Sequence, residues 1–526
     1  MYVLNETLFQ VAGKCFRLVL DNRKVLWCRI YIENYETINK KYFYINWGEV
    51  MKQKEKGLSV WQLTMMAIGT VIGGSFFIGT AVAINAAGPS VVLGFILGGF
   101  LVYFILFALS EMTVSNPAVG SFRTYASQAF GRGTGFVIGW VYWTGMVLAM
   151  SSEATAISIL LRQWFPGASL PLTGCLIIIS VTLINLLGAQ KLSKLESGLA
   201  AIKVFAIVSF IIVAVLLVAG LFNGNPAVGI GSLAGEPFMP GGFQGIAGSI
   251  LIVMFSYAGF EIIGLAASET RRPKENVPKA IRNTVFILVG LYILSITLLL
   301  PLISTSAIST NTSPFVAALN NHGIAWAGSV LSVVLITAIL STMLAAMFGL
   351  GRMMRSLADE GMAPAWLKDK KEVPYRGILA SGAGMLASLA IGMLFPSVYV
   401  FLISAGGFAL LFTYVVIIAT HLRFRKTHGC PPDGRCQLWG YPYTSYFVLA
   451  VLAAAIVSMP FIPDQSYGMI AGSILIAFFA LCYAVIKAVK SRESLRGMRI
   501  KKMHPDLSVE FSKELTDRDK KEKSDE

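Results

Sequence analysis

Long apolar runs separated by short polar segments fill the chain between residues 58 and 490. A helix needs about 20 predominantly apolar residues to cross a bilayer. We count about twelve such runs, which predict an all-α polytopic membrane protein. Their approximate limits are 58–80, 91–114, 133–160, 170–188, 198–221, 242–266, 281–301, 325–351, 377–396, 399–421, 442–462 and 467–488.

Lysine and arginine occupy every second loop between these runs. They follow the second, fourth, sixth, eighth and tenth runs, whereas the alternate loops contain neither residue. Those alternate loops are 81–90, 222–241, 302–324, 397–398 and 463–466. Arg162, after the third run, is the one exception. Because cytoplasmic loops carry the excess of basic residues, the alternation predicts that both termini are cytoplasmic and supports the number of spans.

Composition agrees with the pattern and restricts the class of protein. Of the 526 residues, 55% are hydrophobic and 13% charged, and the mean hydropathy is +0.68. Soluble domains carry about 25% charged residues. A net charge of +15 would indicate nucleic-acid binding in a soluble chain. Here the basic residues lie in loops and indicate membrane orientation instead.

Two flanking segments differ from the membrane domain at 58–490. Residues 1–57 form an N-terminal extension and cytoplasmic lead-in, of which residues 1–50 are not a signal peptide and show no clear helical or strand period. Residues 1–50 are either a genuine disordered or amphipathic extension or an over-called start, with translation beginning at Met51; mass spectrometry of the native protein distinguishes the two. Residues 491–526 are a charged tail that we expect in the cytoplasm.

The first apolar run contains glycines where a plain anchor would have none. Gly69, Gly73 and Gly74 lie in its middle, followed by Ser75, and each glycine costs a helix about 1 kcal/mol relative to alanine. Gly69 and Gly73 could form a small-residue seam for close helix packing. Alternatively, the helix breaks at residues 73–75 and its freed N–H groups face a binding cavity, as in transporters with discontinuous helices. The run alone supports both interpretations.

Four ionisable residues fall inside apolar runs, where each costs at least about 2.5–3.5 kcal/mol. Glu111 lies near the cytoplasmic end of its run and could pair locally. Glu153 and Glu261 are either functional or satisfied by interhelical hydrogen bonds. Lys203 lies a few residues into its run, so it could also extend its amine to the interface.

The sixth run contains a second candidate break. Small residues and a carboxylate lie together from Ser256 to Glu261. The first and sixth runs hold the same place in two five-helix halves, 58–221 and 242–421. Interrupted segments at matching places in two halves are the best sequence indication of a transport site.

Several motifs in this chain resemble those of amino acid permeases of the amino acid–polyamine–organocation superfamily. They are Gly69-Thr-Val-Ile-Gly73-Gly74-Ser75-Phe-Phe, Pro117-Ala-Val-Gly120-Ser-Phe-Arg-Thr-Tyr125-Ala, Gly139-Trp140-Val-Tyr142-Trp143 with Glu153, and Ala267-Ser-Glu-Thr-Arg271-Arg-Pro-Lys-Glu-Asn-Val-Pro-Lys-Ala-Ile281. The match covers roughly 57–490. It implies two inverted five-helix repeats plus two C-terminal helices, with helices 1 and 6 broken.

The resemblance also implies roles at the two breaks. The N–H groups of Gly74 and Ser75, with the Ser75 hydroxyl, would hold the substrate carboxylate. The carbonyls of Val71, Phe255 and Ala258, left without intrahelical donors, would hold the ammonium. Gly73 and Gly74 would let the substrate approach the backbone, Ser256 would belong to the same binding set, and Phe255 would act as a gate.

Lys203 resembles a lysine that, in some members of the family, occupies the place of a sodium ion beside helix 1. A desolvated lysine can lose its proton during transport, so the resemblance favours coupling to H⁺ over Na⁺ and implies no other cofactor. Glu261 resembles a glutamate of gating or proton relay, and we group Glu153 with this pair.

The sequence therefore predicts an amino acid permease of the cell membrane, importing with protons by alternating access. Its partners would be a small amino acid and the lipid bilayer, not nucleic acid. Met150, Phe255 and Tyr257 favour a neutral or apolar substrate. An amino acid or polyamine exchanger on the same fold stays open, as do the particular substrate and the oligomeric state. An enzyme or sensor is disfavoured, because the four histidines form no cluster and the tail is short. Cys430 and Cys436 are expected to be a reduced pair.

Overall fold

The computed structural model describes most of the chain and all twelve predicted apolar runs at least in part. The described residues are 15–20, 23–28, 57–116, 118, 120–187, 189–221, 227–267, 270–310, 312–369, 373–430, 436–462 and 465–503. The hypothesis of a start at Met51 and the tail beyond residue 503 lie outside them.

Helices dominate the described residues. The first half contains α2 (Val60–Val71), α3 (Gly74–Phe77), α4 (Gly79–Ala87), α5 (Val91–Ser115), α6 (Ser121–Phe130), α7 (Arg132–Leu161), α8 (Leu170–Asn185) and α9 (Ala189–Val218). The second half contains α10 (Gly242–Ser256), α11 (Ile262–Ala266), α12 (Pro273–Leu299), α13 (Pro314–Asn321), α14 (Ala325–Asp359), α15 (Tyr375–Gly392), α16 (Val398–His428), α17 (Tyr443–Ser458) and α18 (Ser466–Met503). Among the described residues, eight helical segments are long and apolar enough to cross a membrane.

A β-hairpin lies within the N-terminal extension. Strand β1 (Cys15–Leu20) pairs antiparallel with β2 (Arg23–Cys28), with Cys15 opposite Cys28 and Leu20 opposite Arg23. The sequence analysis found no clear period in residues 1–50 and so did not predict this hairpin. The strands are six residues each, and such short segments gain their hydrogen bonds from pairing rather than from a long alternation of side chains.

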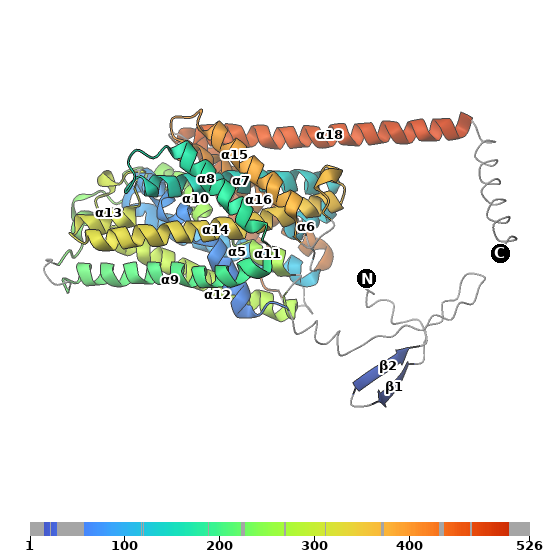
Figure 1. The fold of residues 1–526 in the computed structure, drawn as a ribbon, viewed down its shortest axis with the longest axis horizontal. Coiled ribbons are helices and arrows are strands. Elements are labelled where there is room, and N and C mark those ends of the chain that lie inside the picture. Colours follow the sequence, from blue (N-terminus) through green and yellow to red (C-terminus); the bar gives the residue numbers. More distant parts are fainter. Residues whose placement is uncertain are drawn as a thin grey trace.

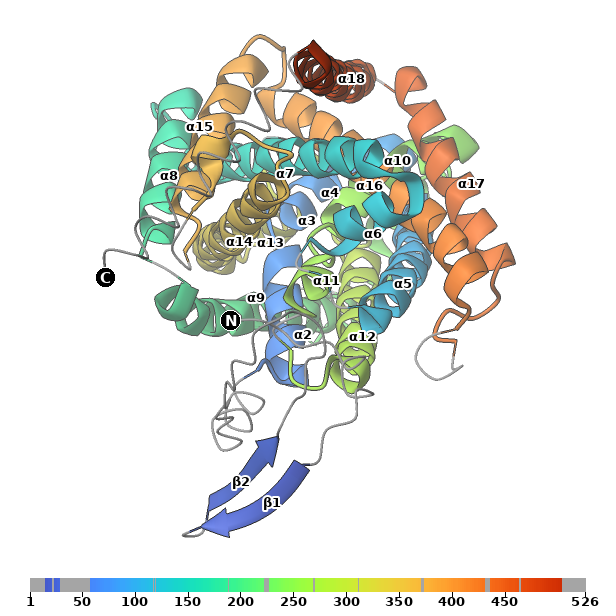
Figure 2. The ribbon, with the colours of Figure 1, turned by 90° about the vertical axis from the view of Figure 1, so that its right-hand side faces the viewer.

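The membrane helices surround a central group formed by the interrupted segments. Most helices run along the long axis of the molecule (Figure 1). The view down that axis shows α2, α3 and α11 near the centre, with α5, α9, α12 and α14 around them (Figure 2). Helix α7 packs against both α14 and α16. The interrupted segments are therefore enclosed by protein rather than by lipid.

The outer surface of this bundle is strongly apolar. Phe205 on α9 is 72% exposed, Phe286 on α12 is 83% exposed and Leu481 on α18 is 64% exposed. A soluble monomer rarely exposes so many large apolar side chains in a continuous surface. Their exposure is consistent with a surface that faces lipid.

Two helices break where the sequence predicts. Helix α2 ends at Val71, and Ile72 (φ −74°, ψ 102°) and Gly73 (φ −143°, ψ −165°) are extended before α3 begins at Gly74. Helix α10 ends at Ser256, and a turn leads to α11 at Ile262. The continuous-helix interpretation of the first run is therefore wrong, because the two extended residues interrupt the ladder of backbone hydrogen bonds.

The segment after α11 holds the start of α2. The N–H of Arg271 donates to the Leu58 carbonyl at 3.0 Å, and its guanidinium Nε donates to the Gly57 carbonyl at 2.6 Å. Leu58 also forms an isolated bridge with Thr270. Residues 268 and 269 of the 267–281 motif lie outside the described residues. The described part of the motif joins the two broken segments at one end of the bundle.

Candidate functional site

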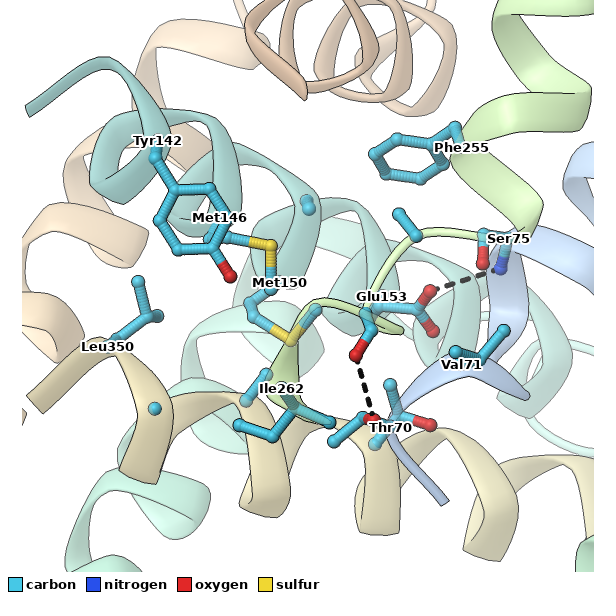
Figure 3. Close-up of a pocket in the computed structure, with 16 residues that line it drawn as sticks. Thr70, Val71, Ser75, Tyr142, Met146, Met150, Glu153, Phe255, Ile262 and Leu350 are labelled. Atoms are coloured by element: carbon cyan, nitrogen blue, oxygen red, sulfur yellow. Dashed lines mark hydrogen bonds between the residues drawn. The ribbon is translucent and has the colours of Figure 1, made fainter. Parts of the chain in front are cut away.

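Glu153 on α7 occupies the gap that opens between α2 and α3. Its side chain is buried, at 3% exposed for the residue. The N–H of Gly74 donates to Oε2 at 2.6 Å, and the N–H of Ser75 donates to Oε1 at 3.0 Å. Figure 3 shows the carboxylate directed at Ser75 across the cavity. One carboxylate therefore binds the first two N–H groups of α3.

Two glycines allow this close approach. A Cβ on Gly73 would lie 3.1 Å from both Glu153 oxygens. A Cβ on Gly74 would lie 2.8 Å from Glu153 Oε2 and 3.0 Å from the Ala156 Cβ. Real Cβ atoms essentially never come within 3.0 Å of a heavy atom that is not bonded to them. The sequence predicted that glycine is needed here for backbone access, and the group that approaches in this structure is a side chain of the protein.

Lys203 and Thr342 bind the carbonyls at the end of α2. The Lys203 ammonium donates to the Gly69 carbonyl and to the Thr342 hydroxyl at 2.7 Å. The Thr342 hydroxyl in turn donates to the Ile72 carbonyl at 2.8 Å. Lys203 is fully buried, so the prediction that it could reach the interface is wrong. Its position beside the broken first helix agrees with the resemblance.

The second break is tied directly to the first. The Ser256 hydroxyl donates to the Ser75 carbonyl at 2.9 Å, and the Thr70 hydroxyl donates to the Gly259 carbonyl at 3.1 Å. Gly259 has φ +106°, and a Cβ there would lie 2.8 Å from the Thr70 carbonyl oxygen. Glycine is required at this turn by both its conformation and the close contact.

Glu261 closes the turn of the second break. It accepts hydrogen bonds from the hydroxyls of Tyr142, at 3.1 Å, and Tyr414, at 3.4 Å. The Gly259 N–H donates to it at 3.1 Å. Glu261 is fully buried, and its hydrogen bonds join α7, α16 and the turn. This agrees with the alternative that interhelical hydrogen bonds satisfy its carboxylate. A gating or relay role stays a prediction.

A cavity lies between the two breaks, α7 and α14 (Figure 3). The predicted residues Val71, Ser75, Met150, Glu153, Phe255 and Ala258 line it. So do residues that the sequence analysis did not single out for the cavity: Thr70, Tyr142, Met146, Ala149, Gly259, Ile262, Thr342, Ala346, Gly349 and Leu350. Several of these missed residues lie on α7 at spacings of three or four, the period of one helix face.

Two predicted contributions differ in the structure. The Phe255 carbonyl accepts the N–H of Ala258, a residue of the turn after α10, at 3.1 Å, so this carbonyl is not free to bind an ammonium group as expected. In a continuous helix the carbonyls of Val71 and Ala258 would accept the N–H groups four residues later, those of Ser75 and Ile262. The Ser75 N–H donates to Glu153 instead, and the Ile262 N–H donates to the Gly259 carbonyl. Tyr257 does not line the cavity; its hydroxyl donates to the Phe95 carbonyl at 3.2 Å, because the turn directs it toward α5.

Glu111 belongs to a separate buried cluster, as local pairing predicted. Arg425 donates to both of its oxygens, at 2.6 and 2.8 Å, and His421 lies 2.7 Å from Oε2. The backbone N–H groups of Gln437 and Leu438 also donate to it. No sequence motif marks His421; only its i, i+4 spacing from Arg425 indicates that the two could share a partner.

Cys430 and Cys436 form a disulfide with a Cα–Cα distance of 4.8 Å. The prediction of a reduced pair is therefore wrong in this structure. Both cysteines lie beside Arg425, whose Nη1 is 2.7 Å from the Cys430 sulfur and 3.0 Å from the Cys436 sulfur. The sequence spacing does not reveal this shared contact.

The fold and the candidate site together indicate the class of protein. A multi-pass helical membrane protein with two interrupted helices around a buried polar cavity has the architecture of a secondary transporter. Residues 62–496 match the family model described as "Amino acid permease", and the chain belongs to that family. It is accordingly a transporter for small amino acid substrates rather than an enzyme.

Three similar proteins illustrate the relationship. The "Gamma-aminobutyric acid permease" of Bacillus subtilis is 31% identical, over 86% of this chain and 98% of that protein. The "Aromatic amino acid transport protein AroP" of Escherichia coli is 32% identical, over 79% and 92%. The solved structure of a mutant manganese transporter of Eremococcus coleocola has a TM-score of 0.50 at 14% identity, covering 83% and 95%; this likeness concerns the fold alone.

Proposed function

We propose that the protein takes up a neutral amino acid across the cell membrane by alternating access, driven by protons. The observation that supports this most is the pair of backbone N–H groups at Gly74 and Ser75, which bind a carboxylate inside the membrane domain. A backbone site of this kind suits the carboxylate of any amino acid. It places no demand on the substrate side chain.

The opposite end of the substrate would meet backbone carbonyls. Val71 and Ala258 both line the cavity, and the N–H groups that would pair with their carbonyls in a continuous helix donate elsewhere. An ammonium group placed between them would satisfy these acceptors. The zwitterion would thus replace backbone hydrogen bonds at both breaks.

The rest of the cavity favours an uncharged substrate side chain. Met146, Met150 and Leu350 line it, and Ile262 faces them from α11. A charged side chain among these groups would be desolvated without a partner. Relatives named for γ-aminobutyric acid and for aromatic amino acids agree with a substrate whose side chain carries no net charge.

Lys203 supports proton coupling in preference to sodium coupling. Its ammonium bonds the Gly69 carbonyl and the Thr342 hydroxyl, oxygen groups of the kind that would coordinate a hard cation such as sodium. A fixed cation at this position leaves no need for a sodium ion. We propose that Lys203, with Glu153 and Glu261, couples proton movement to the opening and closing of the site, and that Phe255 closes over the substrate.

The topology of the proposal follows from the loops and the breaks. We propose twelve spans in two inverted five-helix repeats, α2–α9 and α10–α16, followed by α17 and α18. The excess of Lys and Arg in alternate loops supports cytoplasmic termini. The correspondence of the two breaks within the repeats supports the inverted arrangement.

The test is a thermal-shift screen of the purified protein against the twenty amino acids and γ-aminobutyric acid, followed by uptake in proteoliposomes. A ligand that binds only the folded protein raises its stability by mass action. We expect neutral amino acids to stabilise it and an imposed inward proton gradient to drive their accumulation. Uptake that requires an amino acid on the opposite side, with no response to the proton gradient, would identify an exchanger instead. No stabilisation by any of these compounds would reject the proposal.

A further inference from the structure

We propose that Glu153 is an internal competitor of the substrate: its ionised carboxylate occupies the substrate carboxylate site, and protonation of Glu153 vacates that site for the amino acid. The inference rests on the proposed function and adds a mechanism of coupling to it. Its basis is the pair of hydrogen bonds from Gly74 and Ser75 to the two oxygens of one side chain.

Competition follows from the number of donors. The N–H groups of Gly74 and Ser75 at the start of α3 both donate to Glu153. A substrate carboxylate bound to the same two N–H groups would overlap the Glu153 oxygens, which lie 2.6 Å from the Gly74 nitrogen and 3.0 Å from the Ser75 nitrogen. The two carboxylates therefore exclude each other at this position.

Repulsion between two carboxylates connects the exchange to one proton. Lys203 is the cationic group that interacts electrostatically with Glu153. The other titratable groups that face it are Tyr399 on α16, whose hydroxyl donates to the Gly74 carbonyl at 3.4 Å, and Tyr292 on α12. With Lys203 charged and Glu153 ionised, the one cation faces one carboxylate. The zwitterionic substrate adds no net charge, but its carboxylate would lie directly beside the ionised Glu153, and like charges at one site disfavour each other.

A proton on Glu153 removes that repulsion. The proton adds to a carboxylate oxygen, the neutral carboxyl gives up the charge-assisted hydrogen bonds from Gly74 and Ser75, and the substrate carboxylate takes them and becomes the anion beside Lys203. Glu153 also lines the cavity itself, so a rotation of its side chain moves the neutral carboxyl away from the break. On release of the amino acid, Glu153 loses the proton and returns to the two N–H groups. One proton then crosses with each amino acid.

The experiment measures equilibrium binding of L-alanine, L-phenylalanine and γ-aminobutyric acid to the purified full-length protein as a function of pH. For wild type, binding should weaken about tenfold for each pH unit in the alkaline range, as uptake of one proton requires. Glu153→Gln, a neutral isostere, should bind with little dependence on pH and at least as tightly as wild type at acidic pH. Glu236→Gln, which removes a carboxyl in the 227–241 loop, is the control and should keep the wild-type slope.

Proton uptake on binding, measured in weakly buffered solution, provides a readout that does not depend on any variant. Wild type should take up one proton for each amino acid bound under alkaline conditions. Glu153→Asp, which keeps a titratable group, should retain a pH-dependent affinity. A Glu153→Gln protein with the wild-type slope, or one that no longer binds while wild type does, would overturn the competition but leave the transport function standing. If wild type binds none of the three amino acids at any pH, the proposed function fails, and this inference fails with it.

Discussion

Replacing Gly74 with alanine places one methyl group in the most crowded part of the first break. Its Cβ would lie 2.8 Å from Glu153 Oε2, 3.0 Å from the Ala156 Cβ and 3.1 Å from the Ile339 Cδ1. The Glu153 carboxylate and the Ile339 Cδ1 are ends of flexible side chains and can turn away. The Ala156 Cβ is fixed to the backbone of α7, so relief on that side requires a packed helix to shift. The substitution therefore tests whether the backbone of the break must stay accessible.

The expected magnitude follows from the packing. An added methyl group in a tightly packed interior costs about 1–3 kcal/mol. If that cost falls on the conformation that binds substrate, affinity falls by about 5- to 150-fold, because about 1.4 kcal/mol corresponds to a factor of ten. We expect Gly74→Ala to lose amino acid binding and uptake to this extent while remaining folded, since the added volume is one methyl group.

The assay compares Gly74→Ala with Gly290→Ala on α12. A Cβ on Gly290 meets no heavy atom within 4 Å, and alanine is favoured over glycine in a helix by about 1 kcal/mol. The control should therefore bind and transport as wild type does. Ligand-induced thermal shift and initial uptake rates in proteoliposomes measure the difference. Equal affinity and uptake in the two variants would refute the view that this backbone must be approached closely.

Three further outcomes are expected. Arg425→Met should destabilise the protein by about 3–5 kcal/mol, because Glu111 would stay buried without its cation; in denaturant unfolding, the double variant with Glu111→Gln should recover most of the loss, and an additive double variant would contradict the pairing. Lys203→Met should abolish accumulation driven by a pH gradient in proteoliposomes, whereas undiminished accumulation would remove Lys203 from the coupling mechanism. Burial raises the pKa of Glu236, but hydrogen bonds from Ser304 and Thr305 outweigh it, so its pKa lies below the usual value. Its ionised form therefore stabilises the fold above the unfolded pKa, about 4.3, and this contribution is lost as pH falls through the folded pKa; the thermal midpoint of Glu236→Gln should be lower than wild type at neutral pH and converge with it in acid, and a constant difference would contradict this.

The positions of the broken helices were predictable because each break has a local cause. Gly73 and Gly74 together lower helix stability, and Gly259 adopts a positive φ that other residues avoid. The partners of the freed backbone groups were not predictable. Glu153 lies 79 residues from Gly74 and Lys203 lies 134 residues from Gly69, and no local pattern specifies such pairings.

The β-hairpin and the partners of Glu111 were missed for related reasons. Strands β1 and β2 are too short for a period to be evident, and their hydrogen bonds depend on each other. The Glu111 cluster joins α5 to α16 and to the segment at Gln437. A sequence pattern can mark a buried carboxylate as costly, but it does not say which cation returns to it.

The apolar runs, the basic loops and the glycines determined that this chain is a helical membrane protein with interruptions in two corresponding helices. These properties depend on composition and on local backbone preference, which neighbouring residues set. Tertiary structure alone decided that the carboxylate bound by Gly74 and Ser75 is the protein's own Glu153, and that Lys203 and Thr342 bind the end of α2. Such contacts depend on how helices distant in sequence pack around the break, because each freed polar group in a membrane interior must find its partner from whichever helix lies beside it.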